Sequence, residues 1–302
     1  MEELIRKPLT IKLSPVVQGL LYNRSESSLI EIVAEFADNL RESHGELLQK
    51  RNFATVSKLA TELGYQVVGS PRQNVDFYVE RPFFGSSFRL RGKRVTYLSN
   101  PITEEEARAT IAHDIMHSLF ETTDGQRPGN LPSDEIEEKL CDYGACRLLI
   151  SKAELATVIA HGAGGNVASN IARVAGYFNI PRRYAAMRLF DPLCPLSNSG
   201  LTAIVEWRRK SGPTEEPHTS VVPTWSVCRK AFIPWLGSKR SCHARRESIV
   251  ANAMSEDPYF RFSAVEDTNI GSLKGNYLVS VCVLGPKESP YRRVVSVFED
   301  IG

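Results

Sequence analysis

Two histidines four residues apart are the part of this sequence best suited to chemistry. His113 and His117 lie in the run His-Asp-Ile-Met-His, downstream of Thr103 and three glutamates. A threonine followed by acids in the first turn is typical of a helix N-terminus, so we predict a helix from there to about Phe120. Residues four apart on a helix project from one face, and imidazole is a common zinc ligand. The spacing therefore predicts that the two histidines bind one metal ion.

The third ligand of such a site has to come from another element. A catalytic zinc usually has three protein ligands and one position open to water. After a loop rich in glycine and proline, a second helix is predicted to begin at Ser133 and to run past Leu149. Its acidic residues include Glu135, Glu137, Glu138 and Asp142. Glu138 and Asp142 share one face of this helix, and the other two glutamates are expected to point away from it.

The order of these motifs resembles the ImmA/IrrE family of zinc metallopeptidases. In that family a zincin helix precedes a helix of the form Glu-x-x-Ala-Asn/Asp-x-Phe-Ala-x-x-Leu-Leu-Met-Pro, and the matching stretch here runs from Glu138 to Ser151. The resemblance implies that Glu138 is the third metal ligand, beside His113 and His117, and that the cofactor is Zn²⁺. It also implies that Asp142 takes the polar position next to the ligands, in their second shell.

Asp114 is the most important departure from the family pattern. It stands where the family has the glutamate that acts as general base on the zinc-bound water. Aspartate can accept the same proton but is one methylene shorter, and the placement of a base strongly affects the rate. We therefore assign the catalytic role to Asp114 and expect its short reach to weaken or abolish activity. Gly144 at the aromatic position and Ser151 in place of the terminal proline also mark a divergent member.

The resemblance implies a regulatory zinc endopeptidase. Family members often cleave helix-turn-helix repressors, so the expected partner is a protein substrate such as a transcriptional repressor. A zinc ion would lower the pKa of a bound water, and Asp114 would accept its proton before attack on a peptide carbonyl. Two alternatives of other classes stay open. One is a catalytically weak or inactive zincin-fold regulator that binds a repressor or DNA, and the other is a small-molecule sensor that works through residues 192–302.

The N-terminal half of the sequence predicts a mainly helical core with a small β-sheet. Apolar residues at helical spacing predict helices over 27–50 and 53–63. β-type patterns predict strands at 65–69 and 75–81 and a hairpin over 87–98. The passage from residue 53 to 98 is similar to the lead-in of the ImmA/IrrE family, so we expect it to precede the metal-binding helix.

The domain organisation is predicted from a change in amino-acid composition near residue 192, where proline and serine become frequent. We expect an α+β fold class: a zincin-like metallopeptidase domain over 1–191, with a small helical unit like a helix-turn-helix at about 165–190, then a β-rich α+β domain over 192–302. The strands expected in the second domain are 201–207, 277–284 and 294–298.

Two basic stretches bear on contact with DNA. The helical pair over 167–189 carries Arg173, Arg182, Arg183 and Arg188. The segment over 225–246 interleaves lysines and arginines with aromatic residues, a mixture that can bind phosphates and stack on bases. Short helix pairs and solvated basic faces are also common without nucleic acid, so DNA contact remains an alternative.

Composition excludes several classes of protein. The chain of 302 residues is 42% hydrophobic and 24% charged with a formal net charge of +2, which is typical of a globular protein and gives no general attraction to nucleic acid or membranes. Six cysteines occur without a Cys-x-x-Cys pair, which favours reduced thiols. No apolar run approaches the ~20 residues of a membrane span, and the first residues do not read as a secretory signal. We therefore expect a cytoplasmic protein with no membrane partner.

Overall fold

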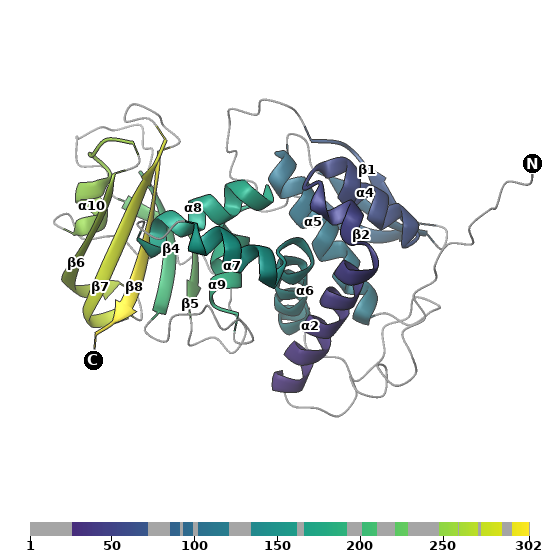
Figure 1. Cartoon of the computed structure of the whole chain (residues 1–302), viewed down its shortest axis with the longest axis horizontal. Helices are drawn as coiled ribbons and strands as arrows, with labels where there is room; N and C mark the ends of the chain where they lie inside the picture. The colour runs from purple at the N-terminus through teal and green to yellow at the C-terminus, as the bar shows by residue number, and fades with distance from the viewer. Residues whose placement is uncertain are drawn as a thin grey trace, which may run out of the picture. The chain divides into compact units, whose positions relative to one another are not determined.

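The chain folds as an α+β protein in two units, as a computed structural model shows (Figure 1), so the expected fold class is confirmed. Unit 1 comprises Met1–Ser151 and Phe178–Pro181, and unit 2 comprises Lys152–Tyr177 and Arg182–Gly302. The structure describes residues 26–71, 85–90, 93–98, 102–120, 134–161, 166–191, 201–209, 221–228, 248–258, 260–270, 273–285 and 292–301. Contacts thus divide the chain after Ser151. The division by function near residue 192 stays a prediction.

Unit 1 is built around two helices that lie against each other. Its helical elements are α2 (Glu26–Ser43), α3 (Gly45–Gln49), α4 (Phe53–Glu62), α5 (Glu104–His117), the 3₁₀ turn η1 (Ser118–Phe120) and α6 (Asp134–Leu149). Both α2 and α5 pack against α6, and α4 packs against α5. The prediction of one helix over 27–50 is wrong, because the backbone leaves the helical region at His44 (φ −127°, ψ 26°). The next residue, Gly45, favours such a break because glycine is a poor helix former.

A three-stranded sheet packs beside α5. Its strands β1 (Tyr65–Val68), β2 (Gly85–Leu90) and β3 (Lys93–Leu98) lie in the order β1-β3-β2, with β1 parallel and β2 antiparallel to β3. These strands confirm the predicted strand and hairpin, whereas the strand expected at 75–81 lies outside the described residues. The hydroxyl of Tyr65 donates a hydrogen bond of 2.8 Å to the backbone oxygen of Asp114, which ties β1 to α5.

The helix α5 begins where the sequence predicts. The side chain of Thr103 accepts a hydrogen bond of 3.3 Å from the backbone nitrogen of Glu106, and glutamates fill the first turn. This cap satisfies an amide at the N-terminus, and the acids interact favourably with the positive end of the helix dipole. Most of α5 is buried, including Ile111 and Ile115 at 0% exposure, so the helix has a fixed rotation about its axis.

A glycine lets the second helix approach closely. A Cβ atom on Gly144 of α6 would lie 2.5 Å from the sulfur of Met116 on α5 and 2.8 Å from a methyl carbon of Val33 on α2. Both distances are well inside van der Waals contact, so a larger residue would require the side chains of Met116 and Val33, or the helices that carry them, to move. Gly144 therefore permits the close approach of α6 to α5.

The segment Phe178–Pro181 belongs to unit 1 although its neighbours in sequence belong to unit 2. The buried guanidinium of Arg108 on α5 donates hydrogen bonds to the backbone oxygens of Phe178 and Asn179. The side-chain amide of Asn179 donates to the backbone oxygen of Arg51 at 3.0 Å, and the Arg51 guanidinium lies over the Phe178 ring. These contacts hold the segment in place through its backbone.

Unit 2 contains a five-stranded antiparallel sheet in the order β5-β4-β8-β7-β6. Its elements are α7 (Lys152–Ala160), α8 (Val167–Phe178), α9 (Arg182–Leu189), β4 (Leu201–Arg209), β5 (Val221–Cys228), α10 (Ile249–Ala253), β6 (Arg261–Ile270), β7 (Leu273–Leu284) and β8 (Arg293–Asp300). The three strands expected after residue 192 fall in β4, β7 and β8. Valines from β7 and β8 pack with Trp207 of β4 and Met254 after α10 in an apolar core.

Two buried polar side chains of β4 contact other polar groups of unit 2. Glu206 of β4, at 0% exposure, pairs with Arg182, and Arg293 approaches its carboxylate at 3.9 Å. Trp207 donates to the hydroxyl of Ser296 at 2.7 Å.

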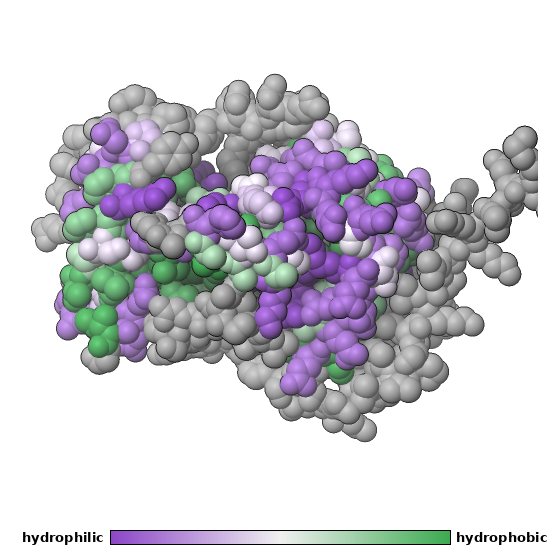
Figure 2. Space-filling view, in the orientation of Figure 1, coloured by the Kyte–Doolittle hydropathy of each residue, from purple (hydrophilic) through white to green (hydrophobic). Residues whose placement is uncertain are grey.

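Figure 2 shows a hydrophobic surface over part of β6–β8 and a largely hydrophilic one over α2 and α4. None of the helices formed by the described residues combines the length and apolar character needed to cross a membrane.

Candidate metal centre

The four acidic and imidazole side chains predicted to form the site meet between α5 and α6. His113 and His117 extend from α5, and Glu138 and Asp142 extend from α6. The Nδ1 atom of His113 lies 2.9 Å from a carboxylate oxygen of Asp142. Its other ring nitrogen, Nε2, lies 3.1 Å from a carboxylate oxygen of Glu138. These side chains thus lie close together in space.

A fifth residue, Glu137, supports the second histidine. The Nδ1 atom of His117 lies 2.9 Å from a carboxylate oxygen of Glu137. The expectation that Glu137 points away from the site is therefore wrong. The α6 residues at 137, 138, 141 and 142 follow the i, i+1, i+4, i+5 spacing of one helix face, which is the sequence signal that would have identified it.

These contacts fix the roles of the ring nitrogens. An ionised carboxylate only accepts hydrogen bonds, so the Nδ1 atoms of His113 and His117 are the donors to Asp142 and Glu137. In the neutral imidazoles, the Nε2 atoms then carry lone pairs. The two Nε2 atoms lie 3.1 Å apart, and Glu138 oxygens lie 3.1 Å from that of His113 and 3.5 Å from that of His117. Electron pairs that converge so closely repel unless a proton or a cation lies among them.

The separations of the two Nε2 atoms from each other and from the nearer Glu138 oxygen, Oε2 for His113 and Oε1 for His117, can be compared with those in a zinc site. Zinc binds imidazole nitrogen and carboxylate oxygen at about 2.0–2.2 Å, and in a tetrahedron the ligand atoms are separated by about 1.63 times that length, or about 3.3–3.6 Å. The observed separations of 3.1–3.5 Å are close to this value. The residues therefore fit a tetrahedral ion with His113, His117 and Glu138 as three of its ligands.

The close approach of the carboxylates to His113 shifts the pKa values in the cluster. Burial lowers the pKa of His113, but the carboxylates of Asp142 and Glu138 outweigh burial and raise the pKa to about 10. The hydrogen bond from His113 in turn lowers the pKa of Glu138. With no metal bound, a proton on His113 can therefore stabilise the cluster, and a metal ion would have to displace it.

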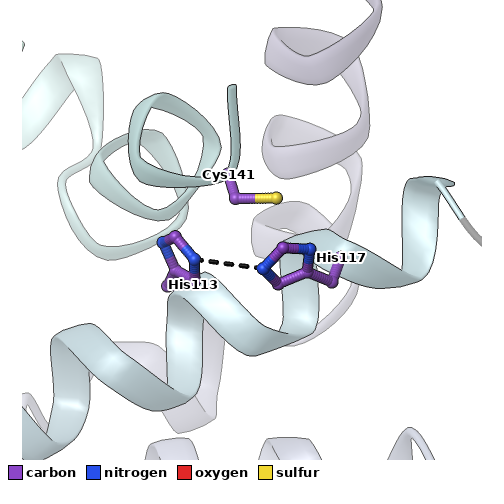
Figure 3. A group of neighbouring side chains, drawn as sticks. All are labelled: His113, His117 and Cys141. Atoms are coloured by element: carbon purple, nitrogen blue, oxygen red, sulfur yellow. Dashed lines mark hydrogen bonds between the residues drawn. The ribbon is translucent and has the colours of Figure 1, made fainter. Parts of the chain in front are cut away.

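Cys141 brings a sulfur atom to the same place. Its thiol and the ring nitrogens of His113 and His117 lie within 4.8 Å of one another and form a group that could hold a metal ion. Figure 3 shows the Cys141 side chain of α6 beside the two facing imidazoles of α5. Burial, and then the carboxylates around it, raise the pKa of the Cys141 thiol. The sequence interpretation noted this residue only as a border of the helix face.

Asp114, the predicted base, is buried at 4% exposure between α5 and the small sheet. Burial raises the pKa of its carboxyl group, while the hydroxyl of Thr96 and the two site histidines lower it. Among the described residues, no hydrogen-bond partner meets its Oδ2 atom. Because an unpaired buried carboxylate oxygen is costly, this atom is poised to accept a proton or a hydrogen bond.

Some of the basic residues considered for DNA binding contact other residues of the protein, and the rest of that set includes residues outside the described part of the chain. In the pair α8 and α9, Arg188 is buried at 1% exposure and pairs with Asp191, and Arg173 donates to Asn170. Six of the eight residues of α9 are buried. A recognition helix has to expose side chains to bases, so these features do not favour that role. The basic run over 229–246 lies outside the described residues, and DNA contact stays a prediction.

Comparison with known proteins gives a fold and no family. No family model matches the chain, and no curated protein does. Among solved structures, a Mycobacterium tuberculosis transcriptional regulator is similar with a TM-score of 0.50 and 15% identity, over 94% of this chain and 80% of that one. At this identity the likeness concerns the fold alone.

Proposed function

We propose that this protein is a zinc-dependent regulatory endopeptidase of the ImmA/IrrE type. The observation that carries the proposal is the convergence of His113 Nε2, His117 Nε2 and the two Glu138 carboxylate oxygens, whose separations of 3.1–3.5 Å suit a tetrahedral zinc ion. Two histidines and one glutamate are a ligand set of catalytic zinc sites, which keep one position open. When bound there, the ion would polarise a peptide carbonyl and activate a water molecule.

Other residues of the chain would orient the ligands, accept a proton and bind the substrate. Asp142 and Glu137 orient the imidazoles and keep their Nε2 atoms directed at the ion, as outer carboxylates do in zinc enzymes. Asp114 accepts the proton of the attacking water, because its Oδ2 atom has no other partner among the described residues. Within the part of the small sheet that the structure describes, β2 is an edge strand, to which a peptide substrate can add by backbone hydrogen bonds. The proposed substrate is a helix-turn-helix repressor.

A second function has its own support. The fold is similar to that of a protein described as a transcriptional regulator, and Asp114 is shorter than the usual glutamate. A zincin-like regulator that binds a repressor without cleaving it would retain the metal cluster and lose only the chemistry. Both functions therefore require the metal ligands, and only the endopeptidase requires Asp114 as a base.

The test combines metal content with cleavage. We expect one zinc per chain by elemental analysis, and reduced zinc in His113→Ala, His117→Ala and Glu138→Ala. Glu31→Ala, which removes an exposed carboxylate from α2, is the matched control and should keep its zinc. Full zinc in a triple ligand variant would disprove the site.

The base is tested in the zinc-loaded protein. A panel of helix-turn-helix repressors is incubated with wild type and Asp114→Asn, and fragments are followed by mass spectrometry. An amide cannot accept the proton, so Asp114→Asn should keep zinc and lose cleavage by about 10²–10⁴-fold. Equal cleavage by both would disprove the base, and stable binding of a repressor without cleavage by wild type would favour the regulator.

A further inference from the structure

Two potential metal donors on α6 approach the histidine pair from different environments. The side chain of Glu138 is 59% exposed, whereas Cys141, three residues later, is at 0% exposure. Residues three apart on a helix are neighbours, so both side chains can reach one ion held by His113 and His117. One donor reaches the ion from the solvent side, and the other from the protein interior.

The sulfur of Cys141 is near coordination distance. Zinc binds thiolate sulfur at about 2.3 Å and imidazole nitrogen at about 2.0–2.1 Å, which in a tetrahedron separates sulfur from nitrogen by about 3.5–3.6 Å. The sulfur now lies within 4.8 Å of the histidine nitrogens. A side-chain movement of about 1 Å, comparable to ordinary thermal displacement in proteins, is enough to complete the bond.

A buried cysteine by itself is usually a small apolar residue of the core, and α6 supplies the comparison. Cys146, five residues further along the same helix, is also buried, at 1% exposure, and is not in a disulfide. Of these two thiols, only that of Cys141 groups with the histidine nitrogens. The position of Cys141 is therefore distinguished by its neighbours and not by its burial.

We propose that Cys141 is a fourth protein ligand that closes the metal site into a latent form. The proposal rests on the proposed metal site and concerns its regulation. In the closed form His113, His117, Glu138 and Cys141 fill all four positions, so neither water nor a peptide carbonyl can reach the ion. The sulfur–hydrogen bond breaks as the sulfur–metal bond forms, and the proton leaves to solvent without any change in oxidation state. Release of the thiol reopens the position for substrate.

Cobalt(II) spectroscopy tests the sulfur ligand directly. Cobalt occupies zinc sites, and a thiolate bound to it gives a near-ultraviolet charge-transfer band that nitrogen and oxygen ligands do not give. We expect this band in the cobalt-loaded wild type and in the matched control Cys146→Ser. We expect it to be lost in Cys141→Ser and Cys141→Ala, with about one cobalt per chain still bound.

The outcomes separate the two proposals. A wild type that binds one cobalt without the band, or a Cys141→Ala variant that keeps the band, overturns the fourth ligand and leaves the three-ligand site standing. A wild type that binds no cobalt or zinc overturns both.

Closure has a second readout that needs no substrate. A small hydroxamate requires an open position on the metal, so the closed form predicts at least tenfold weaker hydroxamate binding by wild type than by Cys141→Ala, measured on the zinc-loaded proteins. Equal binding by the two proteins would disprove closure.

Discussion

The charged cluster around Glu206 in unit 2 and the one around His113 in unit 1 are balanced in different ways. In unit 2 the buried carboxylate of Glu206 pairs with Arg182 and lies near Arg293, so its charge is balanced within the unit. In unit 1 the carboxylates of Glu138 and Asp142 converge on imidazoles whose Nε2 atoms face each other at 3.1 Å. In the first arrangement basic side chains of the same unit lie beside the carboxylate, and in the second a proton or a cation among the Nε2 atoms would relieve their repulsion.

This difference teaches where a bound ligand would contribute to stability. A ligand stabilises the part of the protein that forms its site, because the unfolded chain does not present the same ligands together. An ion held between α5 and α6 would therefore stabilise unit 1. The apolar sheet core of unit 2 gains nothing from it, so the stabilities of the two units should respond differently to metal.

The largest expected effect comes from removing the metal. A free zinc concentration a thousand times its dissociation constant stabilises a site by about 4 kcal/mol, and a chelator should remove that contribution from unit 1. Hydrogen exchange followed by mass spectrometry resolves the two units, and α5 and α6 should lose protection while β7 and β8 keep theirs. An equal loss in both units would break the comparison.

A substitution that breaks an ion pair in unit 2 should lower the stability of the protein without lowering its zinc content. Replacing Glu206 with alanine leaves the nearly buried Arg293 without its acidic neighbour, and breaking a buried ion pair from one side costs about 3 kcal/mol or more. Urea unfolding should show this loss while zinc content stays at the wild-type level. Glu256→Ala removes an exposed carboxylate after α10 and serves as the control. A fall in zinc content in Glu206→Ala would contradict the independence of the two units.

The smallest expected effect concerns the outer carboxylates. Glu137→Gln and Asp142→Asn keep the shape of each side chain but weaken its hold on an imidazole, and such changes typically lower metal affinity about 10–100-fold. Competition with a chromophoric chelator measures this affinity, with Glu31→Gln as the control. If Glu137→Gln binds zinc as tightly as wild type, the contact of Glu137 with His117 has no role in binding.

The sequence predicts the elements that carry strong local signals. Thr103 and the acids after it fix the start of α5, and the spacing of His113 and His117 then places both rings on one face. The resemblance to a known family singled out Glu138 among the acids of the next helix, and the structure places its carboxylate beside both histidines. Metal identity and catalysis remain predictions.

Elements with mixed local signals could not be predicted. The strand β5 contains Pro223, which lacks a backbone donor, so the sequence argues against a strand in the middle of a sheet. In the described sheet β5 is an edge strand and lies beside a bulge in β4, and a proline is tolerated there. The edge strand β6 carries exposed polar residues, so its apolar alternation is weak. The spacing of residues 137, 138, 141 and 142 indicates one face of α6, but which of these side chains meets which histidine depends on the rotation of the helix about its axis, which packing fixes.

The close approach at Gly144 bears on which ion the protein can select. The distance between α5 and α6 sets how far apart the ligand atoms lie, and a single hydrogen atom in place of a side chain keeps that distance short. Ligand atoms at these separations would match ions with bonds near 2 Å, whereas calcium binds its ligands at about 2.3–2.6 Å and gathers six to eight oxygens. In the proposed metal site, the close helix approach that Gly144 permits would therefore favour the smaller ion.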